Sequence, residues 1–123
     1  HSFDPVRSRP LPSPFVAQVN GESIEVEIEN EALLFAIKPG CFSCQSVLSD
    51  ASEHFPTTQI LFVSSEESSE WENAPHPIHV TPQFLEVAEV KFPPVYLLVR
   101  QGRVVAEGAL FSSKQVLDEI DGR

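Results

Sequence analysis

Cys41 and Cys44, the two cysteines of the chain, stand three residues apart. The sequence around them predicts the end of a buried strand and the start of a helix. At a helix N-terminus, unpaired amides and the helix dipole favour a thiolate. The placement therefore favours thiol–disulfide exchange, with Cys41 at the helix tip as the attacking thiol. Cys44, one turn further on, is positioned to resolve a mixed disulfide.

Two other roles for the cysteine pair were weighed. A structural disulfide across two intervening residues closes so small a loop that it adds little stability through chain entropy. A zinc site would need further ligands, and His76 and His79 have a plausible spacing for a Cys2His2 set. Both histidines fall in a proline-rich loop, and no second cysteine pair exists. We predict no metal and no tightly bound cofactor, and a Cys/His metal-binding protein stays open as an alternative.

The elements that must position the cysteines can be recognised from their apolar patterns. Residues 32–37 are continuously apolar, as expected of a central strand covered on both faces. From Cys44 to Phe55, apolar residues recur every three or four positions, which predicts a helix. A second buried strand is predicted at 59–63. Strand, crossover helix and strand form a βαβ unit, so the two strands should be parallel.

The rest of the sequence predicts a mixed sheet with helices on both faces. Asn20-Gly21 indicates an N-terminal β-hairpin, and Gln101-Gly102 a second hairpin. Pro75 and Pro77 predict a loop. The remaining expected elements are strands at 15–19, 24–29, 95–99 and 103–106, a short acidic helix at 65–71, a short helix from Thr81 through Ala88, and a final helix opened by a capping box at Ser112–Gln115.

Length and charge limit the function classes. With 123 residues and a net charge of −10, the chain fits one acidic domain that has no basic patch for nucleic acid. We divide it into a proline-rich linker or tail at 1–14 and a domain at 15–123. No apolar run reaches the length of a membrane span. The absence of methionine and the proline-rich start suggest a piece of a longer precursor, with a signal or anchor segment ahead of it.

Two stretches resemble the thioredoxin-like superfamily. Leu33-Leu34-Phe35-Ala36-Ile37-Lys38-Pro39-Gly40-Cys41-Phe42-Ser43-Cys44 is similar to the strand, CxxC motif and helix start of these proteins. Lys91-Phe92-Pro93-Pro94-Val95-Tyr96-Leu97-Leu98-Val99, with Gly102-Arg103-Val104 and Glu107-Gly108-Ala109-Leu110, resembles their cis-proline strand and the hairpin after it. The resemblance runs from Phe15 to the C-terminus and is greatest to the exported TlpA-like proteins, including the MauD-like branch.

The resemblance implies a thioredoxin-like fold and a thiol–disulfide oxidoreductase. Cys41 would be its nucleophile and Cys44 its resolving thiol. Phe92 and Pro93 would bind the substrate backbone, with Pro93 rather than Pro94 as the cis residue. The implied substrate is a protein thiol or disulfide, and a redox partner at the membrane is also implied. We expect a monomer outside the cytoplasm, anchored by an N-terminal segment.

The sequence also departs from the family pattern. Gly40 replaces the tryptophan usual before the first cysteine, and Phe35 occupies the place of a buried acid that assists the second cysteine in cytosolic thioredoxins. Trp71, in the acidic loop, is not expected to substitute. These departures favour a dedicated partner over general disulfide reduction. They leave the direction of electron flow open, and they keep a second alternative: a binding module that retains the fold with little catalysis.

Overall fold

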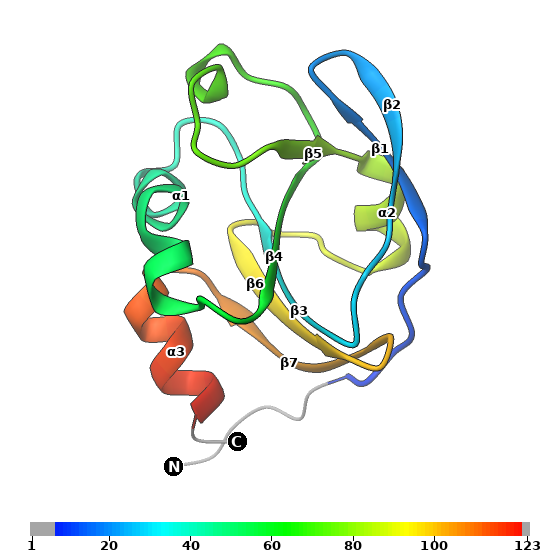
Figure 1. Cartoon of the computed structure of the whole chain (residues 1–123), viewed down its shortest axis with the longest axis vertical. Helices are drawn as coiled ribbons and strands as arrows, with labels where there is room; N and C mark the ends of the chain where they lie inside the picture. The colour runs from blue at the N-terminus through cyan, green and yellow to red at the C-terminus, as the bar shows by residue number, and fades with distance from the viewer. Residues whose placement is uncertain (1–6, 122–123) are drawn as a thin grey trace.

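The computed structural model describes residues 7–121 and contains a seven-stranded sheet with helices on both faces (Figure 1). The strand order is β2-β1-β5-β4-β3-β6-β7. Within the described residues, no helix is long and apolar enough to cross a membrane. The elements are β1 (Phe15–Val19), β2 (Glu22–Val26), β3 (Glu31–Ala36), α1 (Phe42–His54), β4 (Gln59–Ser64), the 3₁₀ turn η1 (Ser69–Trp71), β5 (Ile78–Val80), α2 (Pro82–Val87), β6 (Val95–Arg100), β7 (Arg103–Ala109) and α3 (Ser113–Asp121).

The centre of the sheet is the predicted βαβ unit. β3 pairs with β4 in parallel, which confirms the expectation from the crossover helix α1. On its other side β3 pairs with β6 in antiparallel register, with Ala36 opposite Val95. Because β3 has a strand on each side and a helix layer on each face, five of its six residues are buried. Its continuous apolar sequence is explained by this position.

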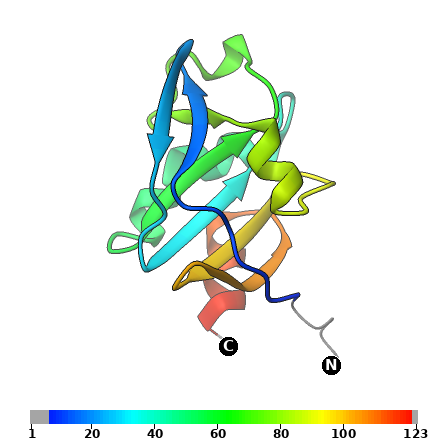
Figure 2. The ribbon, with the colours of Figure 1, turned by 90° about the vertical axis from the view of Figure 1, so that its right-hand side faces the viewer.

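Alternate residues of the central strands divide between two cores, as the period of a strand requires. Leu33 and Phe35 point into a core under α1 and α3, whereas Leu34 and Ala36 point into a second core under α2. Figures 1 and 2 show α1 and α3 on one side of the sheet and α2 on the other, with the N-terminal hairpin β1–β2 at the edge of the sheet beside α2. The expected arrangement, with helices on both faces of a mixed sheet, is confirmed.

The predicted capping box at the start of α3 is present. The Ser112 hydroxyl accepts a hydrogen bond from the Gln115 amide at 3.0 Å, and Gln115 Oε1 accepts one from the Ser112 amide at 3.2 Å. Thr81 is the N-cap residue of α2 and Pro82 follows at the start of the helix, but the Thr81 side chain makes no capping hydrogen bond. Its hydroxyl instead donates to the Val16 carbonyl at 2.8 Å, because β1 passes beside this turn and offers an acceptor that the sequence alone does not reveal.

One strand prediction needs correction, and one strand of the sheet was not predicted. The expected strand at 24–29 ends at Val26, and only that residue of β2 is buried, because β2 is an edge strand with a neighbour on one side. The loop predicted around Pro75 and Pro77 is followed directly by the short strand β5. β5 is held by parallel pairing with β4 and by contact with β1, and it completes the sheet.

The described part of the predicted linker lies against the domain. The Arg9 carbonyl accepts from the Val104 amide at 3.0 Å, and the Leu11 amide donates to the Gly102 carbonyl at 2.9 Å. Leu11 is buried, and the Arg9 guanidinium bonds to both oxygens of Glu107 at 2.8 and 3.0 Å. Residues 1–6 of the expected tail lie outside the described residues. From Arg9 onward the segment covers the edge of β7.

Candidate active site

The two cysteines lie where β3 feeds into α1, as the sequence predicts. Cys41 directly precedes α1, Cys44 lies in its first turn, and a disulfide joins them. Their Cα atoms are 5.2 Å apart. Cys41 is 8 % exposed and Cys44 is fully buried. The order of accessibility therefore agrees with the roles expected from the sequence, although Cys41 is less open to solvent than a helix tip suggests.

The helix start offers hydrogen-bond donors to sulfur. Cys41 is the N-cap residue of α1, and its Sγ accepts a hydrogen bond from the Cys44 amide at 3.1 Å. The Ser43 hydroxyl lies 3.4 Å from the same sulfur. The first turn of α1 carries no acidic residue to oppose a negative charge. In the reduced protein these groups and the helix dipole would stabilise a Cys41 thiolate, the form that attacks disulfides.

The surroundings of Cys44 are apolar. It belongs to the core cluster under α1 and α3, together with Phe35 and Val47. Phe35 is fully buried, and its ring packs against those of Phe55 and Phe62. Phe35 therefore stands at the position at which cytosolic thioredoxins carry an acid, and its ring packs among other aromatic rings. Proton transfer from Cys44 would have to rely on a group outside this strand.

The proline loop and the cysteines meet at one edge of the sheet. Since Ala36 at the end of β3 faces Val95 at the start of β6, the segments beyond these two residues emerge side by side. The peptide bond between Pro93 and Pro94 is cis. Our choice of Pro93 as the cis residue is therefore wrong, and Pro94 holds that place. The choice assumed that the residue before the cis proline needs an N–H, and Pro93, which holds that place, has none. The Pro94 carbonyl accepts a hydrogen bond from the Leu110 amide at 3.1 Å.

Two phenylalanines beside these segments face solvent. Phe42, between the cysteines, is 89 % exposed, and Phe92, before the two prolines, is 84 % exposed. Exposure of such large apolar side chains to water is unfavourable. Two of them beside the cysteines therefore indicate a surface that contacts another molecule. Phe92 remains a candidate for substrate contact, and Phe42 joins it.

The histidines are not placed as a metal set with the cysteines. His76 Nε2 lies 3.0 Å from the Ser52 hydroxyl of α1, and His79 Nδ1–H donates to the Phe62 carbonyl at 3.0 Å. Burial lowers the pKa of His79, an effect partly offset by that hydrogen bond. Within residues 7–121, no group of three or more His, Cys, Asp or Glu is positioned to hold a metal ion.

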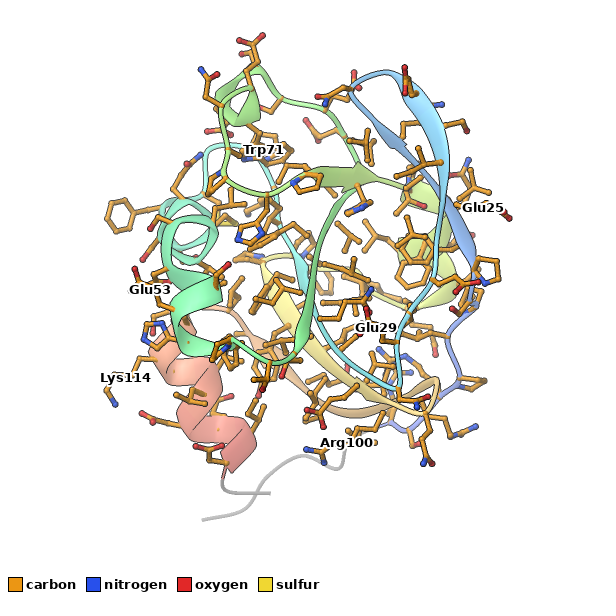
Figure 3. The ribbon with its side chains drawn as sticks, in the orientation of Figure 1. Glu25, Glu29, Glu53, Trp71, Arg100 and Lys114 are labelled. Atoms are coloured by element: carbon orange, nitrogen blue, oxygen red, sulfur yellow. A yellow bond between two sulfur atoms is a disulfide. The ribbon has the colours of Figure 1, made fainter. Side chains whose placement is uncertain are left out.

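The acidic loop contributes to the site, contrary to expectation. Trp71 is 7 % exposed and belongs to the same core cluster as both cysteines. Figure 3 shows it on the inner side of η1, whereas Glu53 and Lys114 lie at the periphery. The neighbouring Glu70 accepts a hydrogen bond from the Gly40 amide at 2.7 Å. Only the single tryptophan in a polar stretch signalled that this loop is anchored.

Comparison of the structure with solved structures identifies the fold. A protein assigned as a thiol:disulfide interchange protein DsbE from Chlorobium tepidum superposes with a TM-score of 0.72 and 14 % identity, over 97 % of this chain and 98 % of that one. The fold is thioredoxin-like. No protein-family model matches the sequence, and no curated protein matches it.

Two further solved structures that match this chain are described as an exposed lipoprotein and as a secreted protein. The exposed lipoprotein thioredoxin of Streptococcus pneumoniae gives a TM-score of 0.66 at 16 % identity, covering 89 % of this chain and 98 % of that one. A secreted Mycobacterium tuberculosis disulfide oxidoreductase homologous to E. coli DsbE gives 0.65 at 13 % identity, covering 89 % and 96 %. The thioredoxin-like fold is therefore shared over nearly the whole length of these chains.

Proposed function

We propose that this domain is a thiol–disulfide oxidoreductase that exchanges its Cys41–Cys44 couple with cysteines of a protein partner. The observation that carries the proposal is the disulfide at the start of α1, with Cys41 Sγ hydrogen-bonded to the Cys44 amide. A couple at this place combines a stabilised attacking thiolate with an adjacent buried thiol that can complete the exchange.

In the reducing direction, the Cys41 thiolate attacks one sulfur of the partner disulfide. The partner's S–S bond breaks, its second sulfur leaves as a thiolate, and a mixed disulfide forms at Cys41. Cys44 loses its proton and attacks Cys41 Sγ, which releases the first partner sulfur and closes the Cys41–Cys44 disulfide. Two electrons pass from the domain to the partner, and the two partner thiolates take up the proton lost by Cys44 and one proton from solvent. The oxidising direction is the reverse sequence.

The partner surface is proposed to include the cis-proline loop. Pro94 and the exposed Phe92 come from a segment that emerges beside the cysteine loop, since β3 and β6 pair at Ala36 and Val95. A backbone segment of a protein substrate can lie along this loop while its cysteine reaches Cys41. Pro93, with no N–H, is proposed to contact substrate through its ring and carbonyl only.

We place the reaction outside the cytoplasm, with a monomeric domain that exchanges electrons with a redox partner at a membrane. The support is the similarity to structures described as a secreted oxidoreductase and as an exposed lipoprotein thioredoxin, together with the resemblance of the sequence to TlpA-like proteins. Fusion of the full-length protein to a reporter that is active on one side of the membrane tests the compartment. Sedimentation of the purified domain tests the monomer.

Single cysteine variants test the exchange itself. Cys41→Ser should abolish reduction of a protein disulfide such as that of insulin. Cys44→Ser should instead accumulate a mixed disulfide with the substrate, visible as a thiol-sensitive adduct by mass spectrometry, because the resolving step is missing. Turnover that persists in Cys41→Ser would contradict the mechanism.

A binding module with little catalysis is the second candidate. It is favoured by the apolar packing around Cys44, where Phe35 stands in place of a proton-transferring acid. Such a module would bind its partner equally well with both cysteines replaced by serine. In an exchange enzyme, replacement of both cysteines by serine would prevent the mixed disulfide, and the substrate would no longer be captured in a detectable complex.

A further inference from the structure

The η1 turn lies against the cysteine motif and is fixed there by its own sequence. Trp71 is buried in the cluster that contains both cysteines. The Ser68 hydroxyl caps the turn by accepting from the Glu70 amide at 3.3 Å, and the Trp71 amide donates to the Ser68 carbonyl at 3.2 Å. The hydrogen bonds to Ser68 and the buried Trp71 side chain hold the turn in place, and they thereby fix the direction of the Glu70 side chain.

Glu70 contacts the residues on both flanks of the motif. Its Oε1 accepts from the Gly40 amide at 2.7 Å, and its Oε2 accepts from Gln45 Nε2 at 3.3 Å. Gly40 directly precedes Cys41, and Gln45 directly follows Cys44. The first turn of α1 has no acidic residue of its own. The Glu70 carboxylate therefore brings a negative charge from another element to the end of the helix where the thiolate forms.

Gly40 is suited to this contact. It has a φ of +68°, in the left-handed region that favours glycine. Its amide points to Glu70 in this conformation. The tryptophan that the family resemblance leads one to expect here would be strained, and the contact would be disturbed. The glycine in place of the expected tryptophan therefore permits the hydrogen bond with Glu70 of the η1 turn.

We propose that Glu70 is a positioning residue of the exchange reaction, which holds the main chain before Cys41 and disfavours the thiolate, so that the couple becomes a stronger reductant. The inference rests on the proposed exchange function. A nearby negative charge opposes thiolate formation, whereas stabilisation of the reduced form makes a couple a stronger oxidant. Exposed Lys38 on the β3–α1 segment carries the opposite charge, but no hydrogen bond or ion pair with another of residues 7–121 holds its side chain near the motif.

The purely structural role of Glu70 makes a different prediction. A carboxylate near a helix N-terminus stabilises the helix through its dipole. If Glu70 did only that, its removal would lower the stability of the oxidised and reduced domains alike. The redox equilibrium would then stay unchanged, so the potential separates the two roles.

The experiment compares wild-type domain with Glu70→Gln and Glu72→Gln in glutathione redox buffers. Glu70→Gln keeps an oxygen that can accept from Gly40 but removes the charge, and exposed Glu70 can be replaced without opening the core. Glu72 is also exposed and close in the sequence, and its side chain makes no hydrogen bond or ion pair with the rest of residues 7–121, so it is the matched control.

We expect the equilibrium constant of Glu70→Gln to shift about three- to tenfold toward the reduced form, where tenfold corresponds to about 30 mV for two electrons. The thiolate absorbance of reduced Cys41 should appear at lower pH than in wild type, and Glu72→Gln should match wild type. If Glu70→Gln also matched wild type, the inference would be overturned while the exchange function stood. If wild type itself did not titrate reversibly, the proposed function would fail, and this inference with it.

Discussion

The Cys44 amide donates a hydrogen bond to Sγ of Cys41 across 3.1 Å. The donor belongs to the buried cysteine and the acceptor to the more exposed one. In the proposed exchange, the same amide would donate to the Cys41 thiolate once the disulfide opens. The helix start is thus prepared for the thiolate before reduction, which lowers the reorganisation needed for exchange.

Exposed aromatic side chains beside the couple should matter for protein substrates only. Phe42→Ala and Phe92→Ala should leave the free energy of unfolding within about 0.5 kcal/mol of wild type, since both side chains face solvent. Reduction of insulin should slow about tenfold, as expected when an interface anchor is truncated. Reduction of a small disulfide should continue at the wild-type rate.

Val87→Ala is the control for these variants. Val87 is 59 % exposed on α2, on the opposite face of the sheet from α1. Its replacement should leave both rates unchanged. Equal slowing with the small disulfide would show that the phenylalanines act on the chemistry of the cysteines and not on the partner.

The ion pair between Arg9 and Glu107 should anchor the N-terminal segment. Arg9 is 8 % exposed and bonds to both carboxylate oxygens and to the Ala88 carbonyl. Arg9→Ala should therefore lower the free energy of unfolding at pH 7 by about 2 kcal/mol. Arg100→Ala, which removes an exposed pair with Glu31, should cost about 0.5 kcal/mol or less.

The loss in Arg9→Ala should depend on pH. The hydrogen bond from Arg9 lowers the pKa of Glu107 in the folded protein below the ordinary 4.5. The resulting stability is present above 4.5 and is lost as the pH falls through the folded-state pKa. The difference in free energy of unfolding between wild type and Arg9→Ala, measured by urea unfolding, should therefore become smaller from pH 7 to strongly acidic pH. A gap of constant size would contradict the assigned ion pair.

Gly40 should be intolerant of a side chain for conformational reasons. A Cβ at this position meets no atom within 4 Å, so only the positive φ opposes substitution. Gly40→Ala should lower the free energy of unfolding by roughly 1–2 kcal/mol. Gly21→Ala, at φ +80° in the distant β1–β2 turn, should cost a similar amount and leave the redox equilibrium unchanged. Wild-type stability of Gly40→Ala would mean that the residue adopts another conformation.

The sequence predicts the parts of the fold that depend on local pattern. The continuous apolar run of β3 and the spacing along α1 identify the βαβ unit, and the cysteines follow from their place between the two. β5 could not be predicted because three residues after Pro77 carry no pattern, and its pairing comes from β4 and β1.

The finer features of the site depend on contacts between distant segments. Glu70 and Gly40 are thirty residues apart, and no spacing rule links them. Two adjacent prolines carry no local signal that distinguishes which of them follows a cis peptide bond. The sequence was enough to nominate the two cysteines, whereas the contact between Glu70 and Gly40 required the structure.

The reduction potential of the Cys41–Cys44 couple is the most direct test of the proposed exchange. The purified domain is equilibrated in thiol–disulfide buffers, and the oxidised fraction is read from the mass after thiol alkylation. We predict one reversible two-electron transition, between about −270 mV, as in thioredoxin, and about −120 mV, as in strong oxidants. A disulfide that stayed closed throughout this range, or a transition that did not reverse, would contradict a redox-active couple.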